Sequence, residues 1–519
     1  MDASSTSALL CNAISESPVP TPLPGTRHHR LLNTNEPPND SDLAFIHSVI
    51  SQTDARLACL DDEISKLQDK LTQLRDERSS LSNYLTRNKA ILSPLRRMPP
   101  ELLGEIFLWT LPSMREIWAR EHYVADSSWA LSHTSSSWRA ICLSIPSLWS
   151  RVAIDYSEAL VPHYPVPLIE TQIQRAQNLK IHFYASLEAD SRRQIQMFEL
   201  LSRHSMRWEE LGIGITPDII PLLAALRDRL SSLKRLWIQW NGEDERQAAV
   251  QFIGCFQNAP SLVDFGVSDH DNFEPVSLPT RQFTYLELDG LVWERHEGIL
   301  KHAQNLVEAR ITFDYLGPWP DTIELPHLRR LHVSYPTALN NLKAPALEEL
   351  SFWVSYQQPL DIVALETFID RSACRLRRLT LRGFPHAHTT IEMLQKAAFI
   401  TELVIAIKEA TAGPEIDLLV SKLAASQGAI MAPQLRALFI GCEEDSCLDY
   451  KMYLEMLRSR LGARSALRNA ALLVERHGPD PETLVGLDAL RQEGMNLSVV
   501  EGNGVSAQVR RWHYMSSWN

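Results

Sequence analysis

The hexapeptides Leu347-Glu-Glu-Leu-Ser-Phe352 and Leu376-Arg-Arg-Leu-Thr-Leu381 contain the pattern that decides the fold of this chain. In both, large apolar residues stand at the first, fourth and sixth positions. The last three residues alternate between apolar and polar. Such an alternation is typical of a short β-strand whose apolar side chains are buried and whose middle residue points outward.

The same pattern occurs ten times along the chain, with some replacements. Its copies begin at Trp208, Leu233, Leu262, Phe283, Leu306, Leu328, Leu347, Leu376, Ile400 and Leu435. The starts are separated by 25, 29, 21, 23, 22, 19, 29, 24 and 35 residues, and most of these spacings lie in or near the 20–29 residues of leucine-rich repeats. We therefore expect residues 151–447 to form a leucine-rich-repeat-like α/β solenoid with a parallel sheet on its concave side. Residues 448–519 are expected to cap its end with helix and strand.

The solenoid is expected to be irregular, because the asparagine ladder of regular repeats is absent after most strands. We expect a partner to bind the outward-facing strand residues and the loops beside them. The candidates are Trp237, Gln239, His332, Trp353 and Arg382, since exposed Trp and Arg often anchor protein partners. For each of these residues the alternative to partner binding is that its side chain packs beneath a loop. The charges on this face are of both signs, so they identify no ligand.

Residues 43–93 show a different period. Steps of three and four from Leu43 to Leu92 meet twelve apolar residues at fifteen positions, and no Pro or Gly interrupts them before Pro94. A repeat of 3.5 residues over seven heptads predicts a coiled-coil helix.

The charges beside this apolar stripe do not identify the partner of the coiled coil. In a parallel homodimer Arg56 would attract Asp61, whereas Lys70 would oppose Arg75. A homodimer, a heterodimer and a helix that folds back on its own domain therefore all remain open.

Residues 1–42 are rich in Ser, Thr, Pro and Asn and show no apolar periodicity. Such a segment cannot bury enough apolar surface to offset the entropy of ordering. We expect it to be a disordered tail.

A cluster of apolar and aromatic residues follows the coiled coil. Met98-Pro-Pro-Glu-Leu-Leu-Gly-Glu-Ile-Phe107 predicts a helix that opens on its prolines and has one broad apolar face. Trp129, Trp138 and Trp149 then occur within 21 residues. By itself the helix would be assigned to an ordinary internal core.

Together with Trp138-Arg-Ala-Ile141 and Pro146-Ser-Leu-Trp149, this helix resembles the F-box. The order of coiled coil, F-box and leucine-patterned C-terminal half resembles the large F-box family of mushroom-forming fungi. The resemblance implies that residues 94–150 form a small three-helix bundle that docks on the Skp-type adaptor of a cullin–RING ubiquitin ligase. By match to the motif, the adaptor-binding residues would be Met98, Pro99, Leu102, Leu103, Ile106, Phe107, Leu131 and Trp138.

The chain departs from the family at Thr134-Ser135-Ser136, where Val-Cys-Arg is usual. The smaller hydroxyl residues remove apolar bulk and one basic group, so adaptor affinity would be reduced. The resemblance also implies that changing Leu103 and Phe107 together to Ala abolishes adaptor binding and leaves the solenoid folded.

The composition limits the classes of function that remain. The chain has 519 residues, and 51 Lys and Arg against 63 Asp and Glu give a net charge of −12. This balance argues against nucleic-acid binding, which needs a basic face, and no long apolar run predicts a membrane span. Seven widely spaced cysteines predict no disulfide framework and fit a reducing compartment. We expect a cytoplasmic or nuclear protein.

The sequence contains no familiar motif for catalysis, for a cofactor or for a metal. We therefore expect an α+β multidomain protein that is not an enzyme and needs no cofactor. It would be the substrate receptor of an SCF-type ubiquitin ligase, with the Skp-type adaptor and an unidentified protein target as partners. The alternative is a scaffold of coiled coil and repeats that acts independently of ubiquitin.

Overall fold

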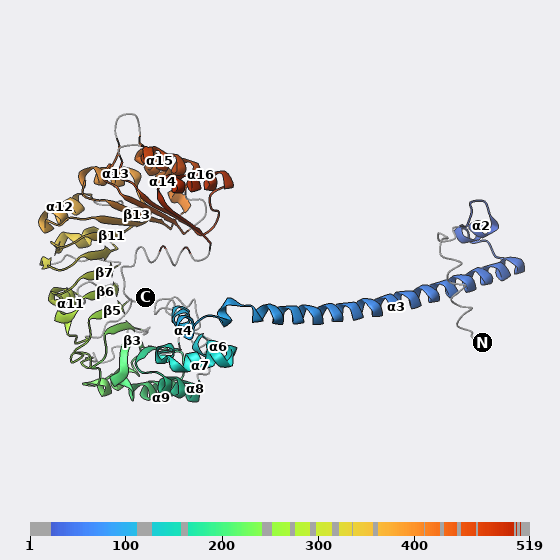
Figure 1. Cartoon of the computed structure of the whole chain (residues 1–519), viewed down its shortest axis with the longest axis horizontal. Coiled ribbons are helices and arrows are strands. Elements are labelled where there is room, and N and C mark those ends of the chain that lie inside the picture. The colour runs from blue at the N-terminus through green and yellow to red at the C-terminus, as the bar shows by residue number, and fades with distance from the viewer. Residues whose placement is uncertain are drawn as a thin grey trace. The chain divides into compact units, whose positions relative to one another are not determined.

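The structure is a computed structural model in which the chain forms two compact units, Met1–Pro99 and Pro100–Asn519 (Figure 1). The residues that it describes are 22–111, 127–156, 165–240, 252–269, 276–290, 297–313, 321–334, 336–356, 362–408, 410–425, 430–443, 448–462, 465–502, 505 and 509.

The first unit is dominated by one long helix. Helix α3 (Asp40–Ile91) has 52 residues, and none of its side chains is buried. Asn39 and Asp42 form a capping box at its start, which satisfies two backbone N–H groups that the helix leaves free. Pro94 follows its end and cannot continue it. The prediction of one continuous helix over residues 43–93 is confirmed, and its partner in a coiled coil remains a prediction.

The expected disordered tail is only partly described. Residues 1–21 lie outside the described residues, and the short helix α2 (Arg27–Asn33) lies in the remainder. The Thr26 hydroxyl caps α2 by accepting a hydrogen bond from the backbone N–H of His29, and Arg27 pairs with Asp42 at 3.2 Å. The expectation of disorder is therefore wrong for this helix, because a cap and an ion pair to α3 hold it in place.

In its described residues, the second unit begins with three helices and one 3₁₀ turn. These are α4 (Pro100–Trp109), α6 (Ser127–Thr134), α7 (Ser136–Ser144) and the turn Pro146–Trp149. Helix α7 packs on both α4 and α6. Trp149 is fully buried at the end of the turn, and its indole N–H donates to the carbonyl of Cys142 over 2.8 Å.

A 14-stranded parallel sheet forms the rest of the second unit, and every strand pairs with the next one in the order of the chain. Its strands are β1 (Arg151–Asp155), β2 (Leu179–Tyr184), β3 (Trp208–Ile215), β4 (Arg235–Trp240), β5 (Asp264–Asp269), β6 (Tyr285–Gly290), β7 (Glu308–Phe313), β9 (Arg330–Val333), β11 (Glu349–Val354), β12 (Arg378–Gly383), β13 (Glu402–Ile407), β14 (Ala437–Cys442), β15 (Asn469–Val474) and β16 (Asn496–Glu501). The short strands β8 (Ile323–Glu324) and β10 (Leu342–Lys343) pair with each other beside it.

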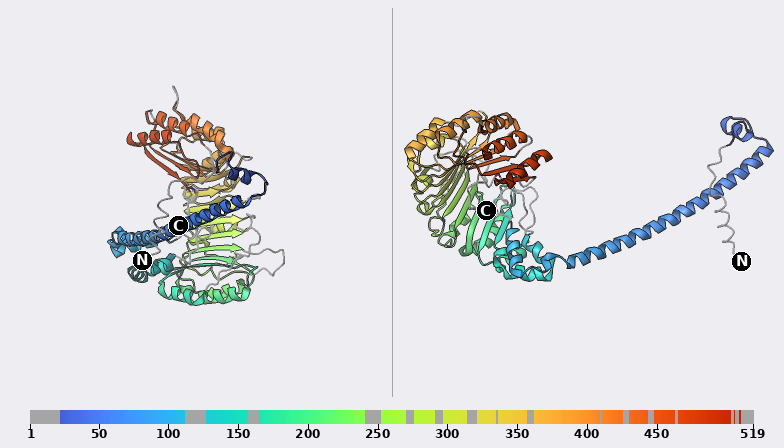
Figure 2. Two further views of the ribbon diagram at one scale, coloured as in Figure 1. Left: turned by 90° about the vertical axis from the view of Figure 1, so that its right-hand side faces the viewer. Right: turned by 45° about the horizontal axis from the view of Figure 1, so that its top comes forward.

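Helices and 3₁₀ turns connect successive strands. The helices are α8 (Val166–Arg175), α9 (Ser191–Ser202), α10 (Ile220–Leu223), α11 (Glu297–His302), α12 (Ile362–Ser372), α13 (Ala387–Lys396), α14 (Gly413–Leu423), α15 (Tyr450–Gly462) and α16 (Pro481–Gln492). They lie on the outer side of the curved sheet, and the strands line its inner side (Figure 2). Apolar strand residues such as Leu236 and Ile238 are fully buried between the two layers.

The ten copies of the L-x-x-L-x-L pattern all lie at strands of this sheet, so the predicted parallel sheet is confirmed. The sheet begins with β1 (Arg151–Asp155), which pairs with β2, at the residue where the solenoid was expected to start. One expectation needs correction. Residues 448–501 are not a separate cap, because β15 and β16 extend the same sheet and α15 and α16 extend the same outer layer.

Arginine side chains satisfy backbone carbonyls between successive coils of the solenoid. Arg207 donates to the carbonyls of Gln177 and Ile173 at 2.8 and 3.0 Å, and Arg371 donates to that of Leu342 at 2.9 Å. These side chains replace the asparagine ladder of regular repeats, since each buried carbonyl needs a donor.

The most enclosed of these arginines is Arg460 on α15, which is fully buried. Its guanidinium donates to the carbonyls of Leu423, Met431 and Ala432. No carboxylate pairs with it among the described residues, and burial lowers its pKa to about 10. The backbone carbonyls therefore provide its main stabilisation.

Replacing Arg460 with Met is expected to lower the free energy of unfolding by about 3 kcal/mol, because three carbonyls lose their donor in the interior. Urea unfolding followed by circular dichroism measures this change. Arg458→Met, an exposed position on the same helix, is the matched control and should change stability by less than about 0.5 kcal/mol. Equal effects of the two substitutions would contradict the role given to Arg460.

The described cysteines differ in state. Cys142, Cys255 and Cys374 are free and buried, and Cys442 is buried as well. Cys59 on α3 is disulfide-bonded, which the spacing of the cysteines did not predict.

Candidate protein-binding surfaces

The inner face of the sheet, on the side away from the helices, presents rows of side chains that the strand register aligns. The row at the start of the strands runs from β2 to β13 and consists of Lys180, Glu210, Arg235, Asp264, Tyr285, Glu308, Arg330, Glu349, Arg378 and Glu402. Apart from Tyr285, every member is charged and the sign alternates from strand to strand, whereas Arg151 of β1 faces Lys180 with the same sign and lies outside the alternation. We call this row the charge ladder.

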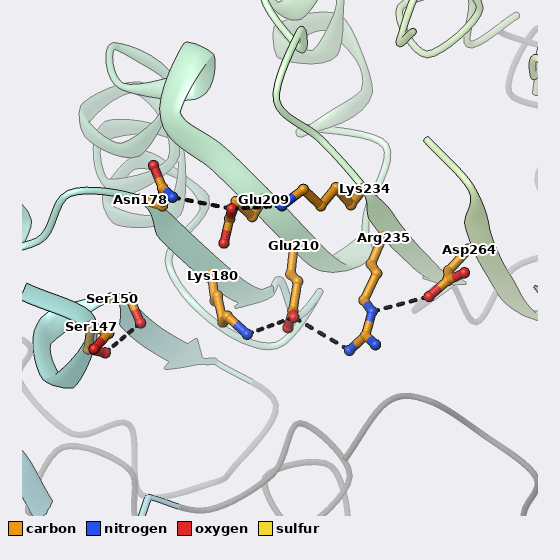
Figure 3. A network of polar contacts seen from close by, with 9 residues as sticks. All are labelled: Ser147, Ser150, Asn178, Lys180, Glu209, Glu210, Lys234, Arg235 and Asp264. Carbon is orange, nitrogen blue, oxygen red and sulfur yellow. Dashed lines mark hydrogen bonds and ion pairs between the residues drawn. The ribbon is translucent and has the colours of Figure 1, made fainter. Parts of the chain in front are cut away.

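Neighbouring members of the charge ladder are joined by ion pairs. Lys180 Nζ lies 2.7 Å from Glu210 Oε1, and Arg235 reaches Glu210 at 3.4 Å and Asp264 at 3.0 Å (Figure 3). Farther along, Arg330 contacts Glu308 at 3.2 Å. Because like charges on facing strands repel, the alternation lets in-register strands place ionic side chains side by side, and it leaves no basic stripe that would attract nucleic acid.

Burial disfavours the charged form of one member of the charge ladder. Glu308 is 8% exposed, and burial raises the pKa of its carboxyl to about 8, although Arg330 opposes the shift. Burial therefore favours the neutral form of the Glu308 carboxyl and opposes its ion pair with Arg330, because a carboxylate costs more to bury than a neutral carboxyl.

The five partner-binding candidates of the solenoid separate into two groups. Trp237 and Gln239 lie on β4, and Trp237 is 7% exposed. Its ring lies over Gly266 of β5, where a Cβ atom would come within 2.2 Å of the ring. Trp237 is thus buried against the neighbouring strand, so it is not the exposed anchor that was expected, and the contact that buries it is with the sheet. The glycine is needed there to let the ring lie flat.

The other three candidates lie on the adjacent strands β9, β11 and β12. His332 is buried, and its Nδ1 lies 2.9 Å from the Ser351 hydroxyl. Trp353 and Arg382 face each other in register, and the Arg382 guanidinium lies 5.1 Å from the centre of the Trp353 ring. A residue that was not among the candidates, Lys408, places its Nζ 5.5 Å from the centre of the same ring.

Trp353 with Arg382 and Lys408 forms a cationic–aromatic cluster near the ends of β11, β12 and β13. Cations over an indole ring are held by its negative face. The indole remains half-exposed and Lys408 is exposed, whereas the Arg382 guanidinium lies deeper and also pairs with Glu443 at 3.7 Å. Lys408 could have been found as the first charged residue after the strand pattern that begins at Ile400.

The inner face changes character at its C-terminal end. Ala406, Ala471 and Leu473 form a buried apolar cluster, and Val505 and Val509 complete it. Phe439 and Val500 pack against the same cluster. Two valines from beyond the last strand therefore pack on the apolar cluster of β13 to β16, and the charge ladder ends at Glu402 of β13.

Helix α4 divides its apolar residues between two faces. Leu103 is 4% exposed and Phe107 is 1% exposed, and Phe107 contacts the Trp138 ring at a centroid distance of 4.7 Å. Leu102 and Ile106 are 55% and 41% exposed. Trp109, which the F-box resemblance did not select, is 86% exposed. We call Leu102, Ile106 and Trp109 the α4 stripe, because their spacing of four and three places them on one side of the helix.

This division corrects the prediction for Leu103 and Phe107. Both side chains belong to the core that holds α4 on α7, so changing them to Ala would remove internal packing and unfold the helices. Leu131 and Trp138 are half-buried, and Trp138 contributes to the same core. In the first unit, Met98 is half-buried and Pro99 is exposed.

The Thr134-Ser135-Ser136 departure has a structural explanation. The Ser135 hydroxyl caps α7 by accepting a hydrogen bond from the backbone N–H of Trp138 over 3.2 Å. The Thr134 hydroxyl donates to the carbonyl of Ala130 at 3.0 Å. The hydroxyl residues therefore begin α7 and close α6, and a Cys at Ser135 would cap α7 less well.

Aromatic and cationic side chains join the helices to the first coil of the solenoid. The Trp129 and Trp149 rings meet edge to face at 5.0 Å. Arg175, at the end of α8, places its guanidinium 4.4 Å from the centre of the Trp149 ring. The helical part and the first strand thus share one core.

Comparisons with known proteins identify no family for this chain. No protein-family model and no curated protein matches the sequence. A crystal structure of a TLR13–ssRNA13 complex is similar over 63% of this chain and 45% of its own chain, with 13% identity and a TM-score of 0.31. This chain thus spans less than half the length of that structure.

Two other kinds of site are absent from the part of the chain that the structure describes. No helix there has the length and apolar character needed to cross a membrane. Within the same residues, no group of three or more His, Cys, Asp or Glu side chains is placed to hold a metal ion.

Changing Glu210 to Gln should destabilise the solenoid by about 2 kcal/mol, because Lys180 and Arg235 lose the carboxylate between them in a buried row. Denaturant unfolding measures the change. The matched control is Glu209→Gln, at the residue that precedes Glu210. The ion pair of Glu209 with Lys234 is more exposed, so this substitution should lower the stability by less than about 1 kcal/mol. A cost for Glu209→Gln equal to that for Glu210→Gln would show that burial of the ladder does not matter.

The raised pKa of Glu308 predicts a pH dependence. Because the folded protein holds this proton up to about pH 8, whereas an unfolded carboxyl loses it near pH 4.5, the carboxyl makes the fold less stable as pH rises between these values. Glu308→Gln removes this dependence. Relative to the wild type, the variant should gain at least about 1 kcal/mol of stability between about pH 5 and pH 8. A pH-independent difference in unfolding free energy would refute the assignment.

Proposed function

We propose that this protein is the substrate receptor of an SCF-type ubiquitin ligase. Its helices α4, α6 and α7 would form an F-box-like domain that binds a Skp-type adaptor, and its leucine-rich-repeat-like solenoid would bind a protein target. The observation that supports the proposal best is the α4 stripe. It leaves Leu102, Ile106 and Trp109 exposed on a helix whose opposite face is fixed in the core.

An exposed apolar row on a rigid short helix suits a partner with an apolar groove. The large side chains of this row have the spacing of three and four residues that helix-binding grooves accommodate. A small helical domain lacks the volume to bury these side chains in its own core. Leu103, Phe107 and Trp138 hold the row in place from behind. In this proposal the motif residues therefore have two roles, with Leu102 and Ile106 contacting the adaptor and Leu103 and Phe107 positioning them.

The solenoid would recognise the target through its inner face and the loops beside it. The cationic–aromatic cluster of Trp353, Arg382 and Lys408 is the best candidate, because Trp and Arg are the residues that most often dominate binding energy. The charge ladder is a poorer one, since Lys180, Glu210, Arg235 and Asp264 are already paired with one another. Within the cluster Arg382 also has an ion pair, with Glu443 at 3.7 Å, so Trp353 and Lys408 are its more available members. A target held there would be brought close to the conjugating enzyme, which raises its effective concentration.

Co-expression with the Skp-type adaptor of the same organism tests the proposal, read by size-exclusion chromatography with light scattering. We expect a stoichiometric complex. A folded protein that forms no complex would refute the receptor function and favour a ubiquitin-independent scaffold that acts through α3 and the solenoid.

The double substitution Leu102→Asp with Ile106→Asp should weaken adaptor binding by about a hundredfold, because two exposed apolar contacts are replaced by charge. Isothermal titration calorimetry measures it, and an unchanged unfolding transition shows that the fold is intact. Val363→Asp on α12, where the valine is 71% exposed, is the control and should bind normally. Full adaptor affinity in the double variant would remove the α4 stripe from the interface.

A further inference from the structure

The long helix α3 exposes an apolar stripe along its whole length. With Leu57 and Ile64 at heptad position a and Leu60 and Leu67 at position d, the a and d positions from Leu43 to Asn88 number fourteen, and eleven of them are large apolar residues. Ten of the eleven are between 37% and 64% exposed, and Ile46 is half-buried. A stripe of this size on a helix with no buried residue is rare on proteins that stay monomeric.

We propose that α3 pairs with α3 of a second copy of this chain in an antiparallel coiled coil, with Ile64 of one copy opposite Leu67 of the other. In this register the residue numbers of facing a and d positions add up to 131. Leu57 then faces Leu74, Leu71 faces Leu60, and Ile50 faces Leu81. The proposal does not depend on the proposed ligase function.

The flanking charges select this register. In an antiparallel pair, g positions face g positions and e positions face e positions. The facing pairs at g positions are Arg56 with Glu77 and Glu63 with Lys70. The facing pair at e positions is Asp54 with Arg75, and each of the three pairs occurs twice by symmetry. All six contacts are attractive, and no like charges meet at these positions.

Other arrangements bring like charges together. Moving the register by one heptad in one direction places Glu63 opposite Glu63, and in the other direction Lys70 opposite Lys70. A parallel pair would place Arg78 opposite Arg78 in the core, whereas the proposed register places Arg78 opposite Thr53. Like charges at facing positions suppress the wrong pairing.

The length of the helix agrees with the register independently of the charges. Helix α3 begins at Asp40 and ends at Ile91, and these numbers also add up to 131. The two helices would therefore overlap from end to end with no overhang. The apolar side chains alone would bury on the order of 1,000 Å² in the pair, close to the area of a stable interface before the flanking residues are counted.

The free charges on α3 fit the same conclusion. Among the described residues, Asp54, Arg56, Glu63, Arg75 and Glu77 have no ion pair within their own chain, and Lys70 has only a hydrogen bond to Gln73 at 3.2 Å. By contrast, Lys66 on the outer side of the heptad pairs with Asp62. The groups that would face the second copy are therefore available for contacts between chains, as are outer charges such as Asp69 and Asp76.

An antiparallel pair has a structural consequence. The C-terminal ends of the two helices would lie at opposite ends of a rod about 75 Å long, since each residue adds about 1.5 Å. The two Pro100–Asn519 units would therefore start far apart. Such a dimer could engage two sites on one target or on one assembly, which raises its overall affinity without new contacts.

The test uses the full-length chain and measures its mass by light scattering and its dimer dissociation constant by sedimentation. We expect a dimer. Lys70→Glu should raise the dissociation constant by roughly tenfold, because two attractions become repulsions with Glu63. In a parallel dimer the same change would relieve the repulsion from Arg75 and tighten binding. Lys66→Glu is the matched control and should leave the constant nearly unchanged.

A charge exchange completes the test. Glu63→Lys combined with Lys70→Glu in one chain restores the antiparallel contacts and should return the dissociation constant to the wild-type value. A monomer at all concentrations, a larger oligomer, tighter binding by Lys70→Glu or no rescue by the exchange would each overturn the proposal.

Discussion

Each strand of the large sheet is hydrogen-bonded to the next strand along the chain, in parallel and in register, and the other features of the second unit depend on this pairing. A single strand and its return segment cannot bury their apolar side chains alone, so each coil is completed by its neighbours. The constraint also aligns equivalent residues of successive coils into rows. Side chains that are far apart in the sequence, such as Lys180, Glu210 and Arg235, thereby become direct neighbours.

The alignment of side chains into rows provides partners for the polar and charged groups of this tightly packed solenoid. On the inner face, alternation of sign turns potential repulsion into a chain of ion pairs. On the outer side, arginines such as Arg207 and Arg460 donate to carbonyls of the neighbouring coil. Both solutions place one charged side chain between two coils, and both would fail if the register shifted by one residue.

The two units present their apolar residues in different ways. Helix α4 is fixed by Leu103 and Phe107 and exposes a short stripe from a rigid support. Helix α3 exposes a long stripe and has no interior of its own. The first arrangement suits recognition by a groove on a partner, and the second suits pairing with another helix. A receptor that dimerised through α3 would combine two such recognition elements in one assembly.

The sequence by itself determined the features that depend on local periodicity. The L-x-x-L-x-L copies located ten strands, and the 3.5-residue repeat located α3 almost to its ends. Both worked because an element with one apolar face repeats its apolar residues at a regular spacing, which can be recognised in one sequence. The repeat did not locate the strands β1, β2, β15 and β16, because the full L-x-x-L-x-L pattern is not present there. Helix α2 was not predicted because its stability comes from a cap and an ion pair with Asp42.

Only the tertiary structure decided which apolar and polar side chains are available to a partner. The sequence placed Leu102, Leu103, Ile106 and Phe107 on one broad face, whereas packing against α7 buries two of them and exposes the other two. It also could not show that Trp237 lies flat on Gly266 or that Lys408 joins Trp353. The physical reason is that exposure depends on neighbours from other elements, and a periodic pattern specifies the face of an element but not what covers it.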